Sequence, residues 1–357
     1  MKSPPVFSVV ILAWQVEPYI CECMESVRNQ TFSDFEAIII APPGKDRTQT
    51  LCREFARNDA RFRVVETENR GQLMNRVVGF SVARGDYLLC VDGDDLWKAD
   101  LLQTVYDGFC ESQCDMLVFG HERFSGGQVF KTVLGVFPNQ AVFDGVRKND
   151  VYEKYIRSGP INEIWGKAFR REVFQQIAAD WGKYESIRKS EDLLFCCYLT
   201  NQADSVMYLD RVLYRYRRNE NGVTLIFREN EIKDYYFVRS EIRRFMTKWW
   251  MEDKRYLDLF YQSLAHYTVD WVFRCATSAL RSAKKKELYE WLRNEAPFYE
   301  ELKPYMDKGV GLGRHRIFWF LFNMNDDLLN RYAAAYRFMK RCKNRFHPSI
   351  AREIGLL

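Results

Sequence analysis

The sequence contains no run of about 20 apolar residues, which is the length that a membrane-spanning helix needs. Its N-terminus has no apolar segment ending in a small-residue cleavage site, the pattern of a secretory signal. None of the ten cysteines forms a CxxC pair with the spacing of a zinc site, and the four histidines lack the spacing of a ligand set or triad. We therefore interpret the histidines as packing or surface residues and expect a cytoplasmic chain with reduced, mostly buried thiols.

The 357 residues are 47% hydrophobic and 15% aromatic, enough to bury a large core. The net charge of +5 is uneven, because residues 228–357 contain 25 Lys and Arg against 17 Asp and Glu. Residues 314–322 and 337–345 combine basic and aromatic side chains, a composition that suits an anionic membrane surface. The alternatives are a helical subdomain packed on the rest of the chain or an oligomer contact. No recognised motif predicts nucleic-acid binding.

The first third of the chain alternates apolar runs with amphipathic segments. Strands are expected at 6–14, 35–41, 62–66, 87–91 and 115–120, and helices at 19–29, 48–60, 72–83 and 101–112. This order predicts an α/β fold built on an open, doubly wound sheet. Such sheets bind ligands at the carboxyl ends of their strands. Residues 14–17, 41–45 and 92–95 should therefore lie together.

The pattern becomes less regular after residue 121. Gly126 and Gly127 predict a hairpin turn, helices are expected at 151–157, 171–179 and 190–201, and short strands at 206–209 and 212–216. Beyond Phe227 the expected segments are helical, including 236–250, 256–278 and 327–342. We predict one domain at 1–225, with halves at 1–121 and 122–225, followed by an all-α region at 226–357.

The acidic run Asp92-Gly93-Asp94-Asp95 follows directly on a buried strand. Three clustered carboxylates repel one another unless water or a cation compensates them. Mg²⁺ or Mn²⁺ would suit this site, because these ions take oxygen ligands and can bridge a carboxylate to a diphosphate. The glycine would let a ligand approach the backbone. The alternative is an ordinary turn in which Asp94 or Asp95 caps a helix that begins near Trp97.

Several motifs across residues 6–225 occur in an order that resembles glycosyltransferase family 2, which has the GT-A fold, a Rossmann-like mixed sheet. They are SVVIL at 8–12, EPYI at 17–20, SVRNQTF at 26–32, ENRG at 68–71, GDY at 85–87, VDGDDLW at 91–97, WGKAFRR at 165–171, SEDLLF at 190–195 and YRYR at 214–217.

The resemblance implies an inverting transferase that uses a nucleotide-diphosphate sugar and Mn²⁺ or Mg²⁺. It implies that Asp192 is the base for the acceptor hydroxyl, with Glu191 assisting, and that Asp94 and Asp92 hold the metal. The alternative for Glu191 and Asp192 is that they form a capping pair in the first turn of a helix. The implied nucleotide-sugar contacts are Trp14, Glu17, Pro42, Arg76, Asp92, Gly93, Asp94, Trp165, Arg215 and Arg217. Core packing remains an alternative role for the two tryptophans. A position on the surface remains an alternative for the three arginines.

One departure from the family's sequence pattern affects the expected identity of the donor nucleotide. Where the family usually has Asp-Asp-Gly-Ser, this chain has Ala41-Pro42-Pro43-Gly44, so the carboxylate expected to recognise a pyrimidine is missing. The family favours a UDP-sugar, and this loop weakens that assignment. The implied acceptor is a glycan or lipid-linked glycan in surface polysaccharide assembly, reached by a chain that is cytoplasmic or peripheral at the inner membrane face. Two alternatives remain: a sugar nucleotidyltransferase, although its Gly-rich, lysine-bearing loop is absent, and a non-catalytic protein that binds sugar nucleotides or glycans.

Overall fold

The computed structural model describes residues 3–219, 227–307 and 326–331. The chain forms two compact units, residues 1–223 and residues 224–357, each of which is described by itself. The basic and aromatic segments at 314–322 and 337–345 lie outside the described residues, so the predicted membrane-surface contact is a prediction only. The expected helix at 327–342 is described only up to residue 331, and that part is helical.

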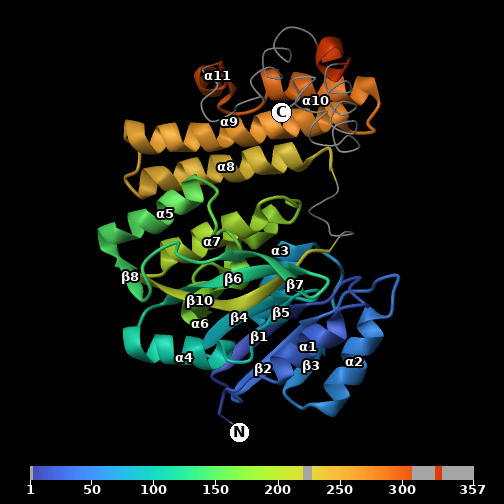
Figure 1. Cartoon of the computed structure of the whole chain (residues 1–357), viewed down its shortest axis with the longest axis vertical. Coiled ribbons are helices and arrows are strands. Elements are labelled where there is room, and N and C mark those ends of the chain that lie inside the picture. Colours follow the sequence, from blue (N-terminus) through green and yellow to red (C-terminus); the bar gives the residue numbers. More distant parts are fainter. Residues whose placement is uncertain (1–2, 220–226, 308–325, 332–357) are drawn as a thin grey trace, which may run out of the picture. The chain divides into compact units, whose positions relative to one another are not determined.

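The first unit is built on one mixed sheet (Figure 1). Its strand order is β3-β2-β1-β4-β9-β6-β10-β5, with β7 paired to β6 and β8 paired to β10. The strands are β1 (Phe7–Leu12), β2 (Phe35–Ile40), β3 (Phe62–Val65), β4 (Tyr87–Asp92), β5 (Leu96–Trp97), β6 (Met116–Ser125), β7 (Gln128–Val133), β8 (Ala141–Asp144), β9 (Lys167–Arg170) and β10 (Ser205–Arg217).

Strands β3, β2, β1 and β4 are parallel, as the alternating sequence pattern predicted. Every residue of β1 and β2 is buried, which accounts for their largely apolar sequences. Strand β9 is antiparallel to both β4 and β6, so the sheet is mixed. The predicted turn at Gly126 and Gly127 is confirmed, since it joins the antiparallel strands β6 and β7. The two short strands expected at 206–216 form one strand, β10, whose register shifts between Leu209 and Tyr214.

Helices pack against this sheet (Figure 1). Helix α3 contacts β1 and β2, and Gly79 permits this packing because a Cβ there would overlap the side chain of Val10. The expected helix at 171–179 is shorter than predicted, and a 3₁₀ segment follows it. The helices are α1 (Ile20–Arg28), α2 (Thr48–Asn58), α3 (Gln72–Ser81), α4 (Leu101–Ser112), α5 (Asn149–Ile156), α6 (Arg171–Gln175) and α7 (Glu191–Gln202), with 3₁₀ turns η1 (Gly145–Lys148), η2 (Ile164–Gly166) and η3 (Ala178–Tyr184).

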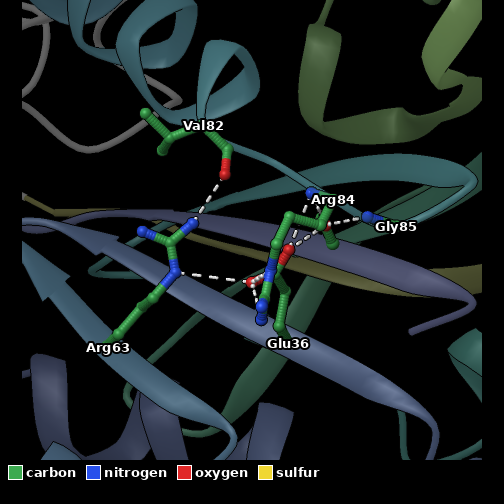
Figure 2. Close-up of polar contacts among 6 residues, drawn as sticks. Glu36, Arg63, Val82, Arg84 and Gly85 are labelled. Carbon is green, nitrogen blue, oxygen red and sulfur yellow. Dashed lines mark hydrogen bonds and ion pairs between the residues drawn. The ribbon is translucent and has the colours of Figure 1, made fainter. Parts of the chain in front are cut away.

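A buried carboxylate on β2 ties the sheet to the segment that precedes β4 (Figure 2). Glu36 is 4% exposed, and it accepts hydrogen bonds from the Ser8 hydroxyl (2.8 Å) and from the backbone N–H (2.8 Å) and guanidinium (2.9 Å) of Arg84. Arg63 donates to the same carboxylate at 3.4 Å. Burial alone would raise the pKa of Glu36, but these hydrogen bonds and positive charges hold it below its usual value. Glu36 is therefore a structural anion.

The described part of the second unit is helical. It contains α8 (Glu231–Lys248), α9 (Lys254–Thr277), α10 (Ser282–Asn294) and α11 (Tyr299–Asp307). Apolar side chains of α8 and α9 are buried, and Tyr236 and Thr268 share a buried hydrogen bond of 2.8 Å between these two helices. The α/β prediction with an all-α C-terminal region is confirmed. No helix in the described ranges combines the length and the apolar character that crossing a bilayer requires.

Candidate functional site

The carboxyl ends of β1, β2 and β4 lie together, as the sequence predicted. The backbone N–H of Gly93 donates to the Leu12 carbonyl at 2.9 Å, and the Trp14 indole donates to the Pro43 carbonyl at 3.2 Å. A Cβ at Gly93 would lie 2.6 Å from the Leu12 oxygen. The close approach of the Leu12 backbone therefore requires glycine at position 93, whether or not a ligand also approaches it.

The loop after β1 is fastened to the loop after β2. The backbone N–H of Glu17 donates to Asp46 at 3.1 Å, while the Glu17 carboxylate accepts from the backbone N–H of Arg47 at 2.8 Å. Pro42 is buried, whereas the Trp14 side chain is 40% exposed at the edge of the site. Sequence reasoning missed Asp46, although its position two residues before Thr48 at a helix start was a usable signal.

Asp95 is a structural residue, and the suggestion that it caps a helix starting near Trp97 is wrong. It is 1% exposed and accepts hydrogen bonds from the Tyr214 hydroxyl (2.6 Å) and from the backbone N–H of Arg217 (2.7 Å). The following helix, α4, begins only at Leu101. Burial, together with the charges of the two neighbouring aspartates, raises the pKa of Asp95 well above its usual value. Asp95 thus attaches the acidic motif to β10.

Asp94 is the acid of the motif with the fewest protein contacts in the described residues. Its carboxylate is half-buried and accepts one long hydrogen bond, from the Asn219 amide at 3.4 Å. Burial, and then the charge of Asp92, raises the pKa of Asp94. In the described part of the chain, no group of three or more His, Cys, Asp or Glu side chains is arranged to hold a metal by itself.

Arg76 joins the acidic motif to the start of α7. Its side chain is 2% exposed and donates to Asp92 at 2.8 Å and, through a short contact, to Asp192. Burial disfavours the charged guanidinium, but Asp192 and Asp92 outweigh this effect and raise the pKa of Arg76. The sequence placed Arg76 beside a leaving diphosphate, and the structure places it between two carboxylates that are 100 positions apart.

Glu191 and Asp192 occupy the first turn of α7. Burial raises the pKa of Asp192, and the positive charge of Arg76 opposes this effect. Burial and the neighbouring Asp192 raise the pKa of Glu191 to about 7. Ser190, just before the helix, has a left-handed backbone conformation with φ of 61°. The turn that presents the two acids is therefore sharply bent.

The two arginines of the YRYR motif have protein partners. Arg217 donates to the Asp94 carbonyl at 2.7 Å and to Glu22 at 2.6 Å, which places it beside the acidic motif. Arg215 forms an ion pair of 2.6 Å with Glu122 on β6. Trp165 is buried at 3% exposure and stacks on the ring of Tyr214 at 4.2 Å. The stacking of Trp165 is the core packing that the sequence left open as an alternative.

Comparisons with known proteins identify the family to which this chain belongs. Residues 8–189, half of the chain, match the family described as Glycosyl transferase family 2. The uncharacterized glycosyltransferase EpsJ of Bacillus subtilis is 32% identical over 225 residues, which cover 62% of this chain and 64% of EpsJ. Glycosyltransferase GlyA of Streptococcus pneumoniae is 28% identical over 226 residues, 62% of this chain and 32% of GlyA. The matches thus span less than two thirds of either relative.

The crystal structure of residues 1–349 of Staphylococcus aureus TarS shares the fold. It superposes with a TM-score of 0.63 at 18% identity, covering 93% of this chain and 91% of that one. The mixed sheet with an acidic motif after its fourth strand is a glycosyltransferase domain of the GT-A fold. Within that class, the chain belongs to glycosyl transferase family 2, which confirms the family resemblance seen in the sequence.

Proposed function

We propose that this protein is an inverting, metal-dependent glycosyltransferase in which Asp192 is the base and Asp94, assisted by Asp92, holds the metal. The observation that carries the proposal is the position of Arg76. One guanidinium contacts both Asp92 and Asp192, so the metal motif and the base lie within the span of one side chain. The separation between the acidic motif and Asp192 suits a donor sugar whose anomeric carbon lies between the diphosphate and the acceptor hydroxyl.

The residues of the acidic motif fit a divalent cation. Asp95 is fully engaged with β10, and Asp92 is paired with Arg76, which leaves Asp94 as the principal ligand. One or two carboxylates plus diphosphate oxygens and water make a usual Mg²⁺ or Mn²⁺ site, so no third protein ligand is needed. A bound Mn²⁺ or Mg²⁺ would stabilise the negative charge of the departing diphosphate.

The chain's own groups then account for the transfer. Asp192 accepts the proton of the acceptor hydroxyl while that oxygen bonds to the anomeric carbon. The bond from the anomeric carbon to the phosphate oxygen breaks, and the nucleoside diphosphate leaves with the electron pair. Because attack and departure occur on opposite faces, the configuration inverts. Arg76 orients Asp192, and its positive charge favours the carboxylate form against the effect of burial, which raises the pKa of Asp192.

The donor side is assigned to residues 1–121 and the acceptor side to residues 122–225. Trp14 at the exposed edge, the buried Pro42 loop, Glu17 and Gly93 would surround the nucleotide, with Arg217 nearest to the acidic motif. TarS has been crystallised with UDP and with UDP-GlcNAc, which supports a UDP-sugar as the first donor to test. Trp165 and Arg215 would support the sugar-binding side by packing.

The acceptor is proposed to be a glycan or lipid-linked glycan of a cell-surface polysaccharide. A relative of Bacillus subtilis, 25% identical over 251 residues, is described as a putative teichuronic acid biosynthesis glycosyltransferase, which supports this class of product. We expect the enzyme to act in the cytoplasm or at the inner membrane face.

The test is a panel of nucleotide sugars offered with Mn²⁺ or Mg²⁺, with release of nucleoside diphosphate as the readout. Asp192→Asn should lower turnover by about 100-fold or more while donor binding persists, because a general base contributes about 10²–10⁴ to the rate. Release of pyrophosphate would instead indicate a nucleotidyltransferase. Donor binding without turnover, unchanged in Asp192→Asn, would indicate a non-catalytic binding protein and contradict the proposal.

A further inference from the structure

A second group of polar side chains lies on β6 and in residues 161–166, the segment that ends in η2, which contacts both β6 and α7. His121 and Arg123 are two residues apart on β6, so their side chains project from the same face of the strand. The His121 ring meets Trp165 edge-on at 4.8 Å, and the Arg123 guanidinium lies 5.4 Å from the centre of the Tyr216 ring. The first contact places β6 against residues 161–166, and the second places Arg123 against the neighbouring strand β10.

Arg123 and Glu163 form a loose ion pair across this junction. Their closest nitrogen and oxygen atoms are 3.7 Å apart, longer than the 2.6–2.8 Å of the ion pairs made by Arg215, Arg217 and Arg76 with Glu122, Glu22 and Asp92. A pair at this separation leaves hydrogen-bonding capacity on both partners. The side chains are partly exposed, 35% for Arg123 and 24% for Glu163, so a ligand can reach them.

Three buried polar atoms near this pair have no hydrogen-bond partner among the described residues. They are His121 Nε2, Arg123 Nε and Asn162 Oδ1. Burial and the nearby positive charge of Arg123 lower the pKa of His121 to about 4, so its ring is neutral near pH 7. Buried polar atoms in folded proteins nearly always have a partner. Open hydrogen-bonding atoms on three neighbouring residues suggest that a polar ligand completes them.

Residues 161–166 also contact the proposed base directly. The backbone N–H of Ile164, next in sequence to Glu163, hydrogen-bonds to the Asp192 carboxylate. Burial raises the pKa of Glu163, the positive charges of Lys167 and Arg123 oppose this effect, and the charge of Asp192 adds a smaller increase. A sugar held by Glu163 would therefore have a hydroxyl within reach of Asp192.

We propose that Glu163 and Arg123 bind a vicinal diol of the acceptor sugar, with Asn162 and His121 completing its hydrogen bonds. The carboxylate accepts from one hydroxyl, and the guanidinium donates to its neighbour. This proposal rests on the proposed function, since it places the acceptor beside Asp192. The feature of the acceptor that this site recognises is an uncharged pair of adjacent hydroxyls.

The first experiment measures binding of simple sugars without a donor. Methyl glucopyranoside, methyl galactopyranoside and methyl mannopyranoside would be tested at millimolar concentration by saturation-transfer NMR, with methyl glucuronide as an anionic comparison. The parent protein should bind at least one of the three neutral sugars, and Glu163→Gln and Arg123→Met should each abolish the signal. Glu153→Gln is the matched control, because Glu153 on α5 forms a 3.0 Å ion pair with Arg157, the residue that follows this helix.

Binding of UDP with Mn²⁺, followed by thermal shift, separates the two proposals. Both variants should bind UDP within about twofold of the parent, which also shows that they fold. Weakened UDP binding in both variants would assign the pair to the donor side and overturn the inference. The inference would also be overturned if either variant still bound the neutral sugars, or if the parent protein bound only the glucuronide. Failure of the parent protein to bind any of the sugars would overturn it as well. Sugar binding that follows this pattern in a protein that binds none of the nucleotide sugars of the panel would support the inference and contradict the proposed function.

Discussion

Replacement of Arg76 by Met should destabilise the first unit strongly, because it leaves two carboxylates without their cation. Asp92 and Asp192 have only 16% and 24% of their side chains exposed, and both contact Arg76. Removing one partner of a buried ion pair typically costs about 3–5 kcal/mol. Since both acids retain some contact with water, we expect about 3 kcal/mol, the lower end of that range.

Hydrogen exchange of the amides in β1 and β4, followed by mass spectrometry, measures this effect. These strands pair in register and are almost entirely buried, so their exchange reports opening of the sheet without treating the whole chain as a single transition. A loss of about 3 kcal/mol corresponds to exchange about 100-fold faster, because 1.4 kcal/mol is a factor of ten.

A second substitution distinguishes the electrostatic explanation from lost packing. Adding Asp192→Asn to Arg76→Met removes one of the two uncompensated charges and should restore at least about 1 kcal/mol of the loss, since contacting residues are energetically coupled. Exchange in Arg76→Met less than tenfold faster than in the parent would refute the reasoning. The reasoning would also be refuted if the loss of stability in the double variant equalled the sum of the losses in the two single variants.

Three further predictions follow from the structure. Glu36→Gln should lower the free energy of unfolding by about 1–3 kcal/mol at pH 7 in urea titrations, because it weakens charge-assisted hydrogen bonds to a buried acceptor. Since the folded pKa of Glu36 is lowered, its contribution is present above its usual pKa of 4.5 and is lost as the pH falls below that value, so the difference between parent and variant should shrink there. Gly93→Ala should lower thermal stability in calorimetry, since its Cβ would lie 2.6 Å from the Leu12 carbonyl, and unchanged stability would contradict this. Asp94→Asn should abolish Mn²⁺-dependent UDP binding in thermal-shift titrations without unfolding the protein, whereas Asp107→Asn, an exposed control, should not.

The sequence predicted the elements whose signals are local. Strands β1 and β2 are mostly apolar runs, broken only by Ser8 and Glu36, that are buried along their whole length, and the Gly126–Gly127 turn has the backbone conformation that glycine favours. The meeting of the loops after β1, β2 and β4 follows from parallel pairing alone. The reversed strand β9 between β4 and β6 could not be predicted from its four residues, because its direction is set only by its partners.

The roles of individual site residues depend on contacts between distant positions. Asp95 had the local pattern of a cap, but Tyr214, 119 residues away, binds it instead. Arg76 had the pattern of a phosphate-binding arginine, yet its guanidinium lies between Asp92 and Asp192. In both cases the sequence identified the charged residue but not the partner that it binds in the folded chain. A motif in the sequence therefore fixes which groups gather at the end of the sheet, while the packing of α3, α7 and β10 decides which of those groups remain free for a ligand. By that reasoning Asp94, with its single long hydrogen bond, is the member of the acidic motif best placed to bind one.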